Sequence, residues 1–197
     1  MSSTVTVNTT SSRGRVDLSS FENAAFDRGA PKAVELAWIL TRSALFERGP
    51  IGLDAVRRRV LAHFGATVGR GGTCRRGVRI TFPWKLEIGE NSWLGEDAWL
   101  LNLDTIQIQA NVTISQRAFL CTGNHDWTDP SMKLTTAPIV VEEGAWIGAA
   151  AFVGPGVTIG SHCVVTAGSV VTRDLPAYSV CAGNPCVPIR ERSVRSR

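Results

Sequence analysis

An aliphatic residue returns at every sixth position along the second half of the chain. The series runs without a gap through Val141, Ile147, Val153, Ile159, Val165 and Val171. A spacing of six matches neither the helical period of about 3.6 residues nor the two-residue period of a half-buried strand. It is typical of a repeat architecture in which every six-residue unit buries one aliphatic side chain. The pattern therefore predicts a solenoid.

The other positions of the repeat predict the shape of each unit. Glycine often follows the aliphatic residue, as at Gly148, Gly154 and Gly160. The fourth residue after each aliphatic position is small or aliphatic. β-branched residues favour short flat runs, and glycine supplies backbone freedom where a chain bends. Each unit is therefore expected to form a short strand and a corner, and three units are expected to close a triangle.

The same spacing extends upstream in groups of three. These groups are Ile108, Ile114 and Leu120, then Ile88, Leu94 and Leu100, and more faintly Val68, Cys74 and Ile80. Two extra residues separate successive groups, so each coil takes about 18 to 20 residues, and successive coils stack as parallel strands. The expected fold is an all-β solenoid, a parallel β-helix of about five triangular coils.

The repeat is interrupted once, after His125. Residues 126–140 separate the third coil from Val141. A long insertion in a regular solenoid usually leaves the body as a loop, and such loops often line binding sites. The functional site is therefore expected at this extruded loop.

The remaining segments divide the chain into four parts. Residues 1–20 are rich in Ser and Thr and are predicted to be disordered, and residues 21–66 are predicted to form a helical N-terminal cap. The helices expected there cover residues 33–46, after Pro31, and residues 53–64. The β-helix is expected over residues 67–176, and residues 177–197 form a C-terminal turn and a basic tail. The favoured interpretation of these helices is a cap that covers the unpaired strand edges at the open end of the solenoid. An interfacial membrane helix is the alternative, because the helices combine Trp, Phe and Leu with arginines.

Composition narrows the class of protein. With 197 residues and 44% hydrophobic positions, the chain suits one well-buried domain with a small appendage. It shows neither a membrane-spanning run nor a signal peptide, so a cytoplasmic location is expected. Five scattered cysteines are interpreted as small core residues in a reducing compartment. The net charge of +4 includes a basic C-terminus, but no nucleic-acid motif accompanies it, and no nucleic-acid partner is expected.

Four motifs resemble those of hexapeptide-repeat acyltransferases. They are TGNHDW at 122–127, PIVVEEGAWIG at 138–148, VGPGVTIG at 153–160 and AGNPC at 182–186. The chain is most similar to the branch that holds galactoside, maltose and nodulation acetyltransferases, and within it to colanic acid biosynthesis acetyltransferases, over roughly residues 17–192. The resemblance implies a left-handed coil and a homotrimer with active sites between neighbouring prisms. It also implies transfer of an acetyl group from acetyl-CoA to a sugar hydroxyl, in exopolysaccharide biosynthesis.

His125 is the candidate catalytic residue. It closes the hexapeptide 120–125, at the corner where the loop departs. A hydroxyl group needs a base to become a good nucleophile, and an imidazole, with an ordinary pKa of about 6.5, suits that task near neutral pH. The resemblance implies the same role, because the matching His of the family is the catalytic base. The group that orients the ring is left open between Asp126, Asp129 and a carboxylate of another coil.

Four polar or aromatic residues are candidates for the acceptor pocket. They are Asn102, Asp104, Asn124 and Trp127, each of which could instead be a corner polar group or a loop anchor. The acceptor-contacting Asn of the branch is replaced near Gly95, which argues against a simple galactoside or maltose acceptor. A sugar on a lipid-linked or nascent glycan is the favoured acceptor, with possible contact to the inner membrane surface. Another small hydroxyl or amine acceptor is the alternative.

The resemblance also implies residues for acetyl-CoA. Alignment of WIGA and TAGS points to the backbone at Ala149 and Ala167, and Trp146 could pack beside the cofactor or act as a spacer between coils. Because Ala149 stands where several relatives have a hydroxyl residue, only its backbone N–H could face the thioester oxygen. Arg173 and Arg190 match basic positions that contact phosphates, although either could be a solvated surface charge.

Three rival interpretations use the same fold. A γ-type carbonic anhydrase binds zinc through three histidines, but His63 falls in the helical cap and leaves only His125 and His162 in the repeats, so no metal is expected. A non-catalytic binding scaffold would not respond to a change of His125. A serine acetyltransferase would need a much longer helical N-terminal domain.

Overall fold

The computed structural model describes residues 14–23 and 26–195. Most of the segment predicted to be disordered, residues 1–13, therefore lies outside the described residues, as does the end of the basic tail at 196–197. The chain separates into two compact units. One comprises the N-terminal segment to Phe26 together with His125–Thr135, and the other comprises Asp27–Asn124 and Thr136–Arg197.

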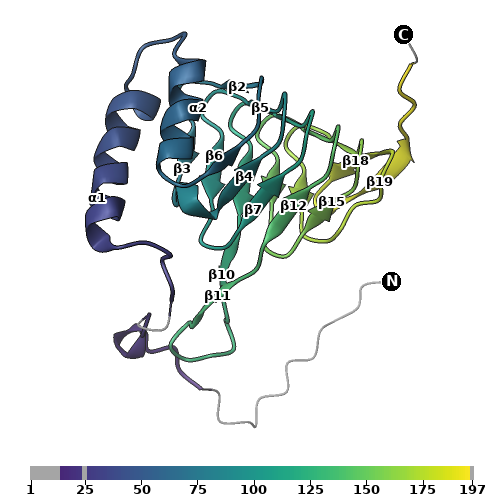
Figure 1. The fold of residues 1–197 in the computed structure, drawn as a ribbon. Coiled ribbons are helices and arrows are strands. Elements are labelled where there is room, and N and C mark those ends of the chain that lie inside the picture. Colours follow the sequence, from purple (N-terminus) through teal and green to yellow (C-terminus); the bar gives the residue numbers. More distant parts are fainter. Residues whose placement is uncertain (1–13, 24–25, 196–197) are drawn as a thin grey trace, which may run out of the picture. The chain divides into compact units, whose positions relative to one another are not determined.

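The larger unit is a stack of triangular coils with three parallel sheets (Figure 1). The first sheet contains β1 (Thr67–Val68), β4 (Leu86–Ile88), β7 (Ile106–Ile108), β12 (Ile139–Val141) and β15 (Thr158–Ile159). The second contains β2 (Thr73–Cys74), β5 (Trp93–Leu94), β8 (Thr113–Ile114), β13 (Trp146–Ile147), β16 (Val164–Val165), β18 (Ser179–Gly183) and β19 (Cys186–Glu191). The third contains β3 (Arg79–Ile80), β6 (Trp99–Leu101), β9 (Phe119–Cys121), β14 (Phe152–Val153) and β17 (Val170–Val171).

The six-residue spacing sets the register between coils. Ile114 pairs with Ile147, which pairs with Val165, and all three side chains are completely buried. Equivalent aliphatic columns fill the other two sheets, and small residues such as Ala118, Ala145 and Ala151 are buried between them, so the coils share one continuous core. The described coils number five, and Leu175 and β18 begin a sixth. The predicted left-handed parallel β-helix of triangular coils is confirmed.

The glycines after the aliphatic positions are required for a different reason from the one predicted. Gly148 and Gly160 are not among the residues with positive φ, so left-handed backbone freedom is not what they supply. A Cβ atom on Gly148 would lie 2.6 Å from the backbone nitrogen of Ala167, and one on Gly160 would lie 2.4 Å from that of Ala177. Glycine there lets the backbone of the next coil approach closely.

The positive-φ corners are taken largely by other residues. Asn91, Asn111, His162 and Tyr178 have φ between 53° and 59° at turns of the stack, and Gly144, with φ of 69°, takes the turn between Asn111 and His162. Asn tolerates this region because its short polar side chain bonds locally, whereas His and Tyr are less common there. The corners are therefore set by the stacking of coils and not by glycine alone.

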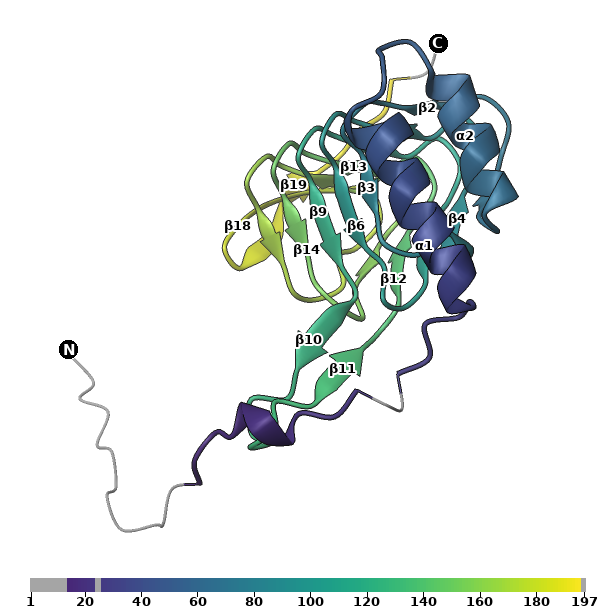
Figure 2. The same ribbon diagram turned by 90° about the vertical axis from the view of Figure 1, so that its left-hand side faces the viewer.

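Two helices cover the first coil (Figures 1 and 2). α1 (Lys32–Thr41) continues into a π-helical turn, η2 (Arg42–Glu47), and α2 (Asp54–His63) follows. Trp38, Phe46 and Leu61 are completely buried and belong to the core of the solenoid, and the Trp38 indole N–H donates to the carbonyl of Ile80 at 3.1 Å. No helix of the described residues has the length and hydropathy to cross a lipid bilayer.

A buried arginine connects the cap to the first coil. Arg57 has no exposed surface, and its guanidinium donates to the carbonyl oxygens of Leu45, Pro50 and Cys74. These bonds satisfy carbonyls at the end of the π-helical turn and at the first coil. A further short helix, η3 (Pro83–Lys85), precedes β4.

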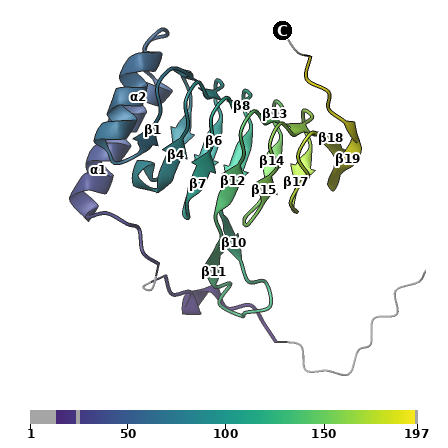
Figure 3. The same cartoon turned by 45° about the vertical axis from the view of Figure 1, so that its right-hand side comes forward.

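The opposite end of the stack closes with a hairpin. β18 and β19 are antiparallel and are joined by a turn at Gly183–Pro185, so the chain returns along the second sheet (Figure 3). The five cysteines are free and buried, as expected for small core residues, and burial raises the pKa of the Cys74 thiol to about 12.

The smaller unit is built from the interruption of the repeat and the N-terminal segment. β10 (Gly123–His125) and β11 (Leu134–Thr136) form a separate two-stranded sheet, so the insertion departs from the three sheets as predicted. η1 (Leu18–Ser20) begins at Asp17, whose side chain accepts a bond from the Ser19 N–H. The backbone N–H of Asp17 donates to the carbonyl of Pro130 at 2.9 Å, which links the N-terminal segment to the loop.

Candidate active site

His125 ends β10 and faces solvent. Its Nδ1 lies 2.6 Å from the carbonyl oxygen of Met132. A carbonyl oxygen can only accept, so Nδ1 of the neutral ring carries the proton and the lone pair is on Nε2. The loop itself therefore sets the tautomer that a general base requires.

Three apolar side chains border one side of the same ring. Leu18, Phe21 and Met132 line a cavity of about 400 Å3 together with His125. The Phe21 and His125 rings have centroids 6.0 Å apart and are tilted by 55°. These neighbours could not be identified from the sequence, because Phe21 lies about a hundred residues from His125 and belongs to no repeat.

The two aspartates near His125 stabilise turns of the loop. Asp126 accepts bonds from the hydroxyl and the backbone N–H of Thr128, at 2.6 and 2.9 Å. Asp129 accepts the equivalent bonds from Ser131 at 2.7 and 2.8 Å. These bonds hold the pKa of both carboxyl groups below its ordinary value. The hydrogen bond seen at the His125 ring among the described residues is to the backbone carbonyl of Met132, and an orienting carboxylate stays a prediction.

A second cavity lies on the coils and unites four of the five residues expected to bind the cofactor. Its volume is about 570 Å3, and its lining includes Trp146, Ala149, Ala167 and Arg190. The sequence did not assign the other lining residues to the cofactor; they are Ser115, Gln116, Gly148, Val164, Val165, Thr166, Val180, Arg192 and Ser193. The Trp146 indole N–H donates to the Ser115 hydroxyl at 2.8 Å, which fixes the ring across two coils.

The cavity combines a largely apolar wall with two arginines. Arg190 is exposed, whereas Arg192 is half-buried and donates to the carbonyls of Gly144 and His162 at 3.0 and 2.9 Å. Arg192 lies two residues after Arg190 in the sequence PIRER (188–192), and the pairing of β19 with β18 brings both arginines to this cavity.

Arg173 is not among the residues that line this cavity. It is exposed in the bend after β17, next to Asp174, whose carboxylate accepts a bond from the Thr158 N–H at 2.7 Å. Its phosphate contact stays a prediction.

The four acceptor candidates have different surroundings. Asn102 is completely buried, and its amide bonds to the backbone of Thr81, Phe82 and Lys85, as a loop anchor would. Asp104 accepts bonds from the Thr105 N–H and the Thr136 hydroxyl. Asn124 is exposed, and Trp127 is 78% exposed. Their acceptor roles stay predictions.

Gly95 has a structural reason for lacking a side chain. A Cβ atom there would lie 2.6 Å from the backbone nitrogen of Gln116. An asparagine side chain at this position would require the next coil to move.

The three histidines of the zinc alternative lie on separate elements. His63 ends α2, His125 ends β10 and His162 occupies a corner of the coils. Within residues 14–23 and 26–195, no group of three or more His, Cys, Asp or Glu side chains is arranged to hold a metal ion.

Comparison with known proteins agrees with this architecture. The pattern of the family described as "Bacterial transferase hexapeptide (six repeats)" matches residues 138–173. The chain is 42% identical over 176 residues to "Putative colanic acid biosynthesis acetyltransferase WcaF" of Escherichia coli K12, covering 89% of this chain and 97% of that protein. It is 31% identical to galactoside O-acetyltransferase of the same organism, over 72% of this chain and 71% of that protein. A solved structure of galactoside acetyltransferase in complex with coenzyme A superposes with a TM-score of 0.74 at 26% identity, covering 82% of each chain. The chain therefore belongs to the hexapeptide-repeat acetyltransferase family.

Proposed function

We propose that this protein transfers the acetyl group of acetyl-CoA to a sugar hydroxyl, with His125 as the general base. The observation that carries the proposal is the bond between His125 Nδ1 and the Met132 carbonyl, which places the basic lone pair on Nε2. The ring also borders a cavity large enough to admit part of an acceptor.

The chemistry asks His125 to move one proton. Acetyl-CoA supplies an acetyl group activated as a thioester. His125 Nε2 accepts the proton of the acceptor hydroxyl as its oxygen bonds to the acetyl carbon, and it can return that proton to the sulfur as the carbon–sulfur bond breaks. Met132 keeps the ring in position throughout, because its carbonyl bonds to Nδ1–H in both protonation states.

The cavity on the coils suits the cofactor. A slender pantetheine arm needs a long apolar wall with accessible backbone groups, and phosphates need cations. The wall around Trp146, Ala149 and Ala167 supplies the first, and Arg190 and Arg192 supply the second. With alanine at 149, a backbone N–H is the donor available at that position for the developing oxyanion.

A cyclic homotrimer is part of this proposal. The flat faces of the prism carry outward aromatic residues, including a column on the third sheet in which Trp99 stacks on Phe119 and Phe119 meets Phe152 edge to face. Trp93 on the second sheet is 54% exposed. Faces of this kind suit contacts between parallel prisms, and a cyclic arrangement lets the loop of one chain reach the coils of the next.

The proposed acceptor is a sugar unit of an exopolysaccharide. Support comes from the 42% identity to a relative named for colanic acid biosynthesis. Screening acetyl transfer by mass spectrometry to galactose, glucose, fucose and lipid-linked oligosaccharides would identify the acceptor class.

The decisive test is His125→Ala, with His63→Ala as a matched control on an exposed part of α2. We expect kcat to fall about a thousandfold in the first variant, while the KM for acetyl-CoA and the unfolding midpoint change little. His63→Ala should behave as the wild type. Equal transfer rates in all three proteins, or failure of the wild type to bind acetyl-CoA, would exclude the proposal in favour of a binding scaffold.

A further inference from the structure

The outer side of α1 is aliphatic where a capping helix is expected to be polar. Ala33, Leu36, Ala37 and Leu40 follow helical spacing and are all exposed, Leu36 by 59% and Leu40 by 64%. The opposite side carries Trp38, which is completely buried in the core. Covering the first coil accounts for the inner side of α1 but leaves its outer side without a role.

Other aliphatic residues of the cap are also exposed. Ile39, Ile51 and Val56 are exposed by 43%, 73% and 40%. We call these three residues, with Leu36, Leu40 and the exposed basic residues Lys32, Arg48 and Arg59, the cap surface.

The carboxylates of the same segment are already paired. Glu35 binds Arg28, Glu47 binds Arg42, and Asp54 binds Arg75. Among the described residues, Lys32, Arg48 and Arg59 form no salt bridge. The cap surface therefore combines exposed aliphatic side chains with basic side chains that form no salt bridge.

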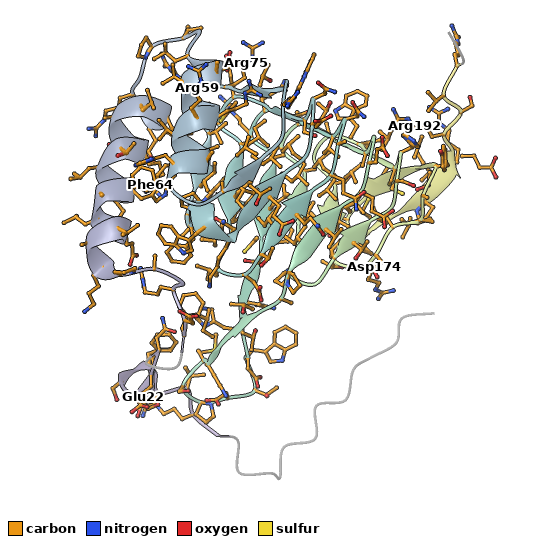
Figure 4. The ribbon with its side chains drawn as sticks, viewed as in Figure 1. Glu22, Arg59, Phe64, Arg75, Asp174 and Arg192 are labelled. Atoms are coloured by element: carbon orange, nitrogen blue, oxygen red, sulfur yellow. The ribbon has the colours of Figure 1, made fainter. Side chains whose placement is uncertain are left out.

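Charge is also divided unevenly along the stack. Residues 32–85 contain eleven basic and three acidic residues, a net charge of +8, whereas residues 86–197 contain seven basic and eleven acidic residues, a net charge of −4. Figure 4 shows Arg59 and Arg75 at the α2 end and Asp174 toward the other end. The positive charge thus gathers at the end of the solenoid that also exposes the aliphatic stripe.

We propose that the cap surface binds an anionic phospholipid bilayer. Exposed aliphatic residues flanked by Lys and Arg are the composition of surfaces that insert into the headgroup region, where the aliphatic chains leave water and the cations meet lipid phosphates. A nucleic acid would use the arginines but would leave Leu36 and Leu40 in water. A second copy on a twofold axis would bring the same positive surfaces together.

The arrangement would also favour binding by several copies. In a cyclic trimer of parallel prisms, which is part of the proposed function, the three cap surfaces lie at the same end and can meet one bilayer together. A bilayer bound at the cap would leave the faces of the prism uncovered, so the cavity on the coils would stay accessible.

The test is sedimentation of the full-length protein with vesicles. We expect binding to phosphatidylcholine vesicles that contain phosphatidylglycerol, weaker binding to phosphatidylcholine alone, and a decrease at high salt. Leu36→Ser with Leu40→Ser should weaken binding by about tenfold or more, and Arg48→Gln with Arg59→Gln should do so as well. Val187→Ser with Ile189→Ser, which removes two aliphatic side chains exposed by 51% and 59% on β19, should bind as the wild type.

Three outcomes would overturn the inference. The first is that the wild type does not bind vesicles, and the second is that all the variants bind equally. The third is a change in the oligomeric state of the Leu36→Ser/Leu40→Ser protein, measured by light scattering, which would make the stripe a protein interface. Acetyl transfer to a soluble sugar, measured without vesicles, should be unchanged in that variant. If the wild type transfers acetyl groups but does not bind vesicles, only the proposed bilayer binding is excluded. If it binds vesicles but does not transfer acetyl groups, only the proposed function is excluded.

Discussion

The coils and the loop differ in how each holds its side chains. In the coils, Ile114, Ile147 and Val165 are stacked and completely buried, so that each is fixed by its equivalents above and below. In the loop, Trp127 is 78% exposed, and order comes from short hydrogen bonds such as those of Asp126 and Asp129. Burial stabilises the scaffold, whereas local bonds position the candidate base without enclosing it.

The largest effect on stability should come from a cavity in the coils. Ile114→Ala removes a fully buried side chain that contacts neighbouring coils, and it should lower the free energy of unfolding by about 2–5 kcal/mol. Trp127→Ala should change it by about 0.5 kcal/mol or less, because the ring is mostly in solvent. Urea unfolding followed by circular dichroism measures both, and an equal loss in the two variants would show that the loop is part of the buried scaffold.

A smaller effect tests the close approach between coils. Gly148→Ala places a Cβ atom 2.6 Å from backbone atoms of the next coil and should cost about 1–3 kcal/mol. Gly154 is its matched control, since the nearest atom to a Cβ there is 3.4 Å away. Gly154→Ala should therefore be neutral or slightly stabilising. Similar unfolding midpoints for both variants would mean that the coils can separate at little cost.

The contrast also explains which features could be predicted from the sequence. The period of six predicted the coils and the core positions, because every unit repeats the same burial and so leaves the same trace in residue type. Trp146, Ala149, Ala167 and Arg190 were grouped by the resemblance to hexapeptide-repeat acyltransferases, and the structure places all four around one cavity. The proposed role of His125 came from the motif at the end of a repeat.

Other features leave no such trace. The Met132 contact uses a backbone carbonyl, which any residue could supply, so residue type carries no signal for it. Phe21 meets His125 through an aperiodic segment distant in sequence. Asn102 satisfies backbone groups from inside the solenoid, and a polar residue near a corner gives no indication of whether its amide faces inward or outward.

The smallest expected effect concerns pH and should be confined to the loop. Bonds from Thr128 and Ser131 lower the pKa of Asp126 and Asp129, so these groups stabilise the loop above the ordinary carboxyl pKa, and that contribution is lost as pH falls through their lowered values. Protection of the Thr128 and Ser131 amides against hydrogen exchange, corrected for intrinsic rates, should therefore decrease as pH falls below the ordinary carboxyl pKa of about 4, while the Ile147 amide in the coils keeps its protection. Asp126→Asn with Asp129→Asn retains acceptor oxygens but does not titrate, so its loop protection should be independent of pH. If loop protection decreased equally in the wild type and in this variant, the acid sensitivity would belong to other groups. The distinction between a loop held by carboxylates and coils held by burial would then be lost.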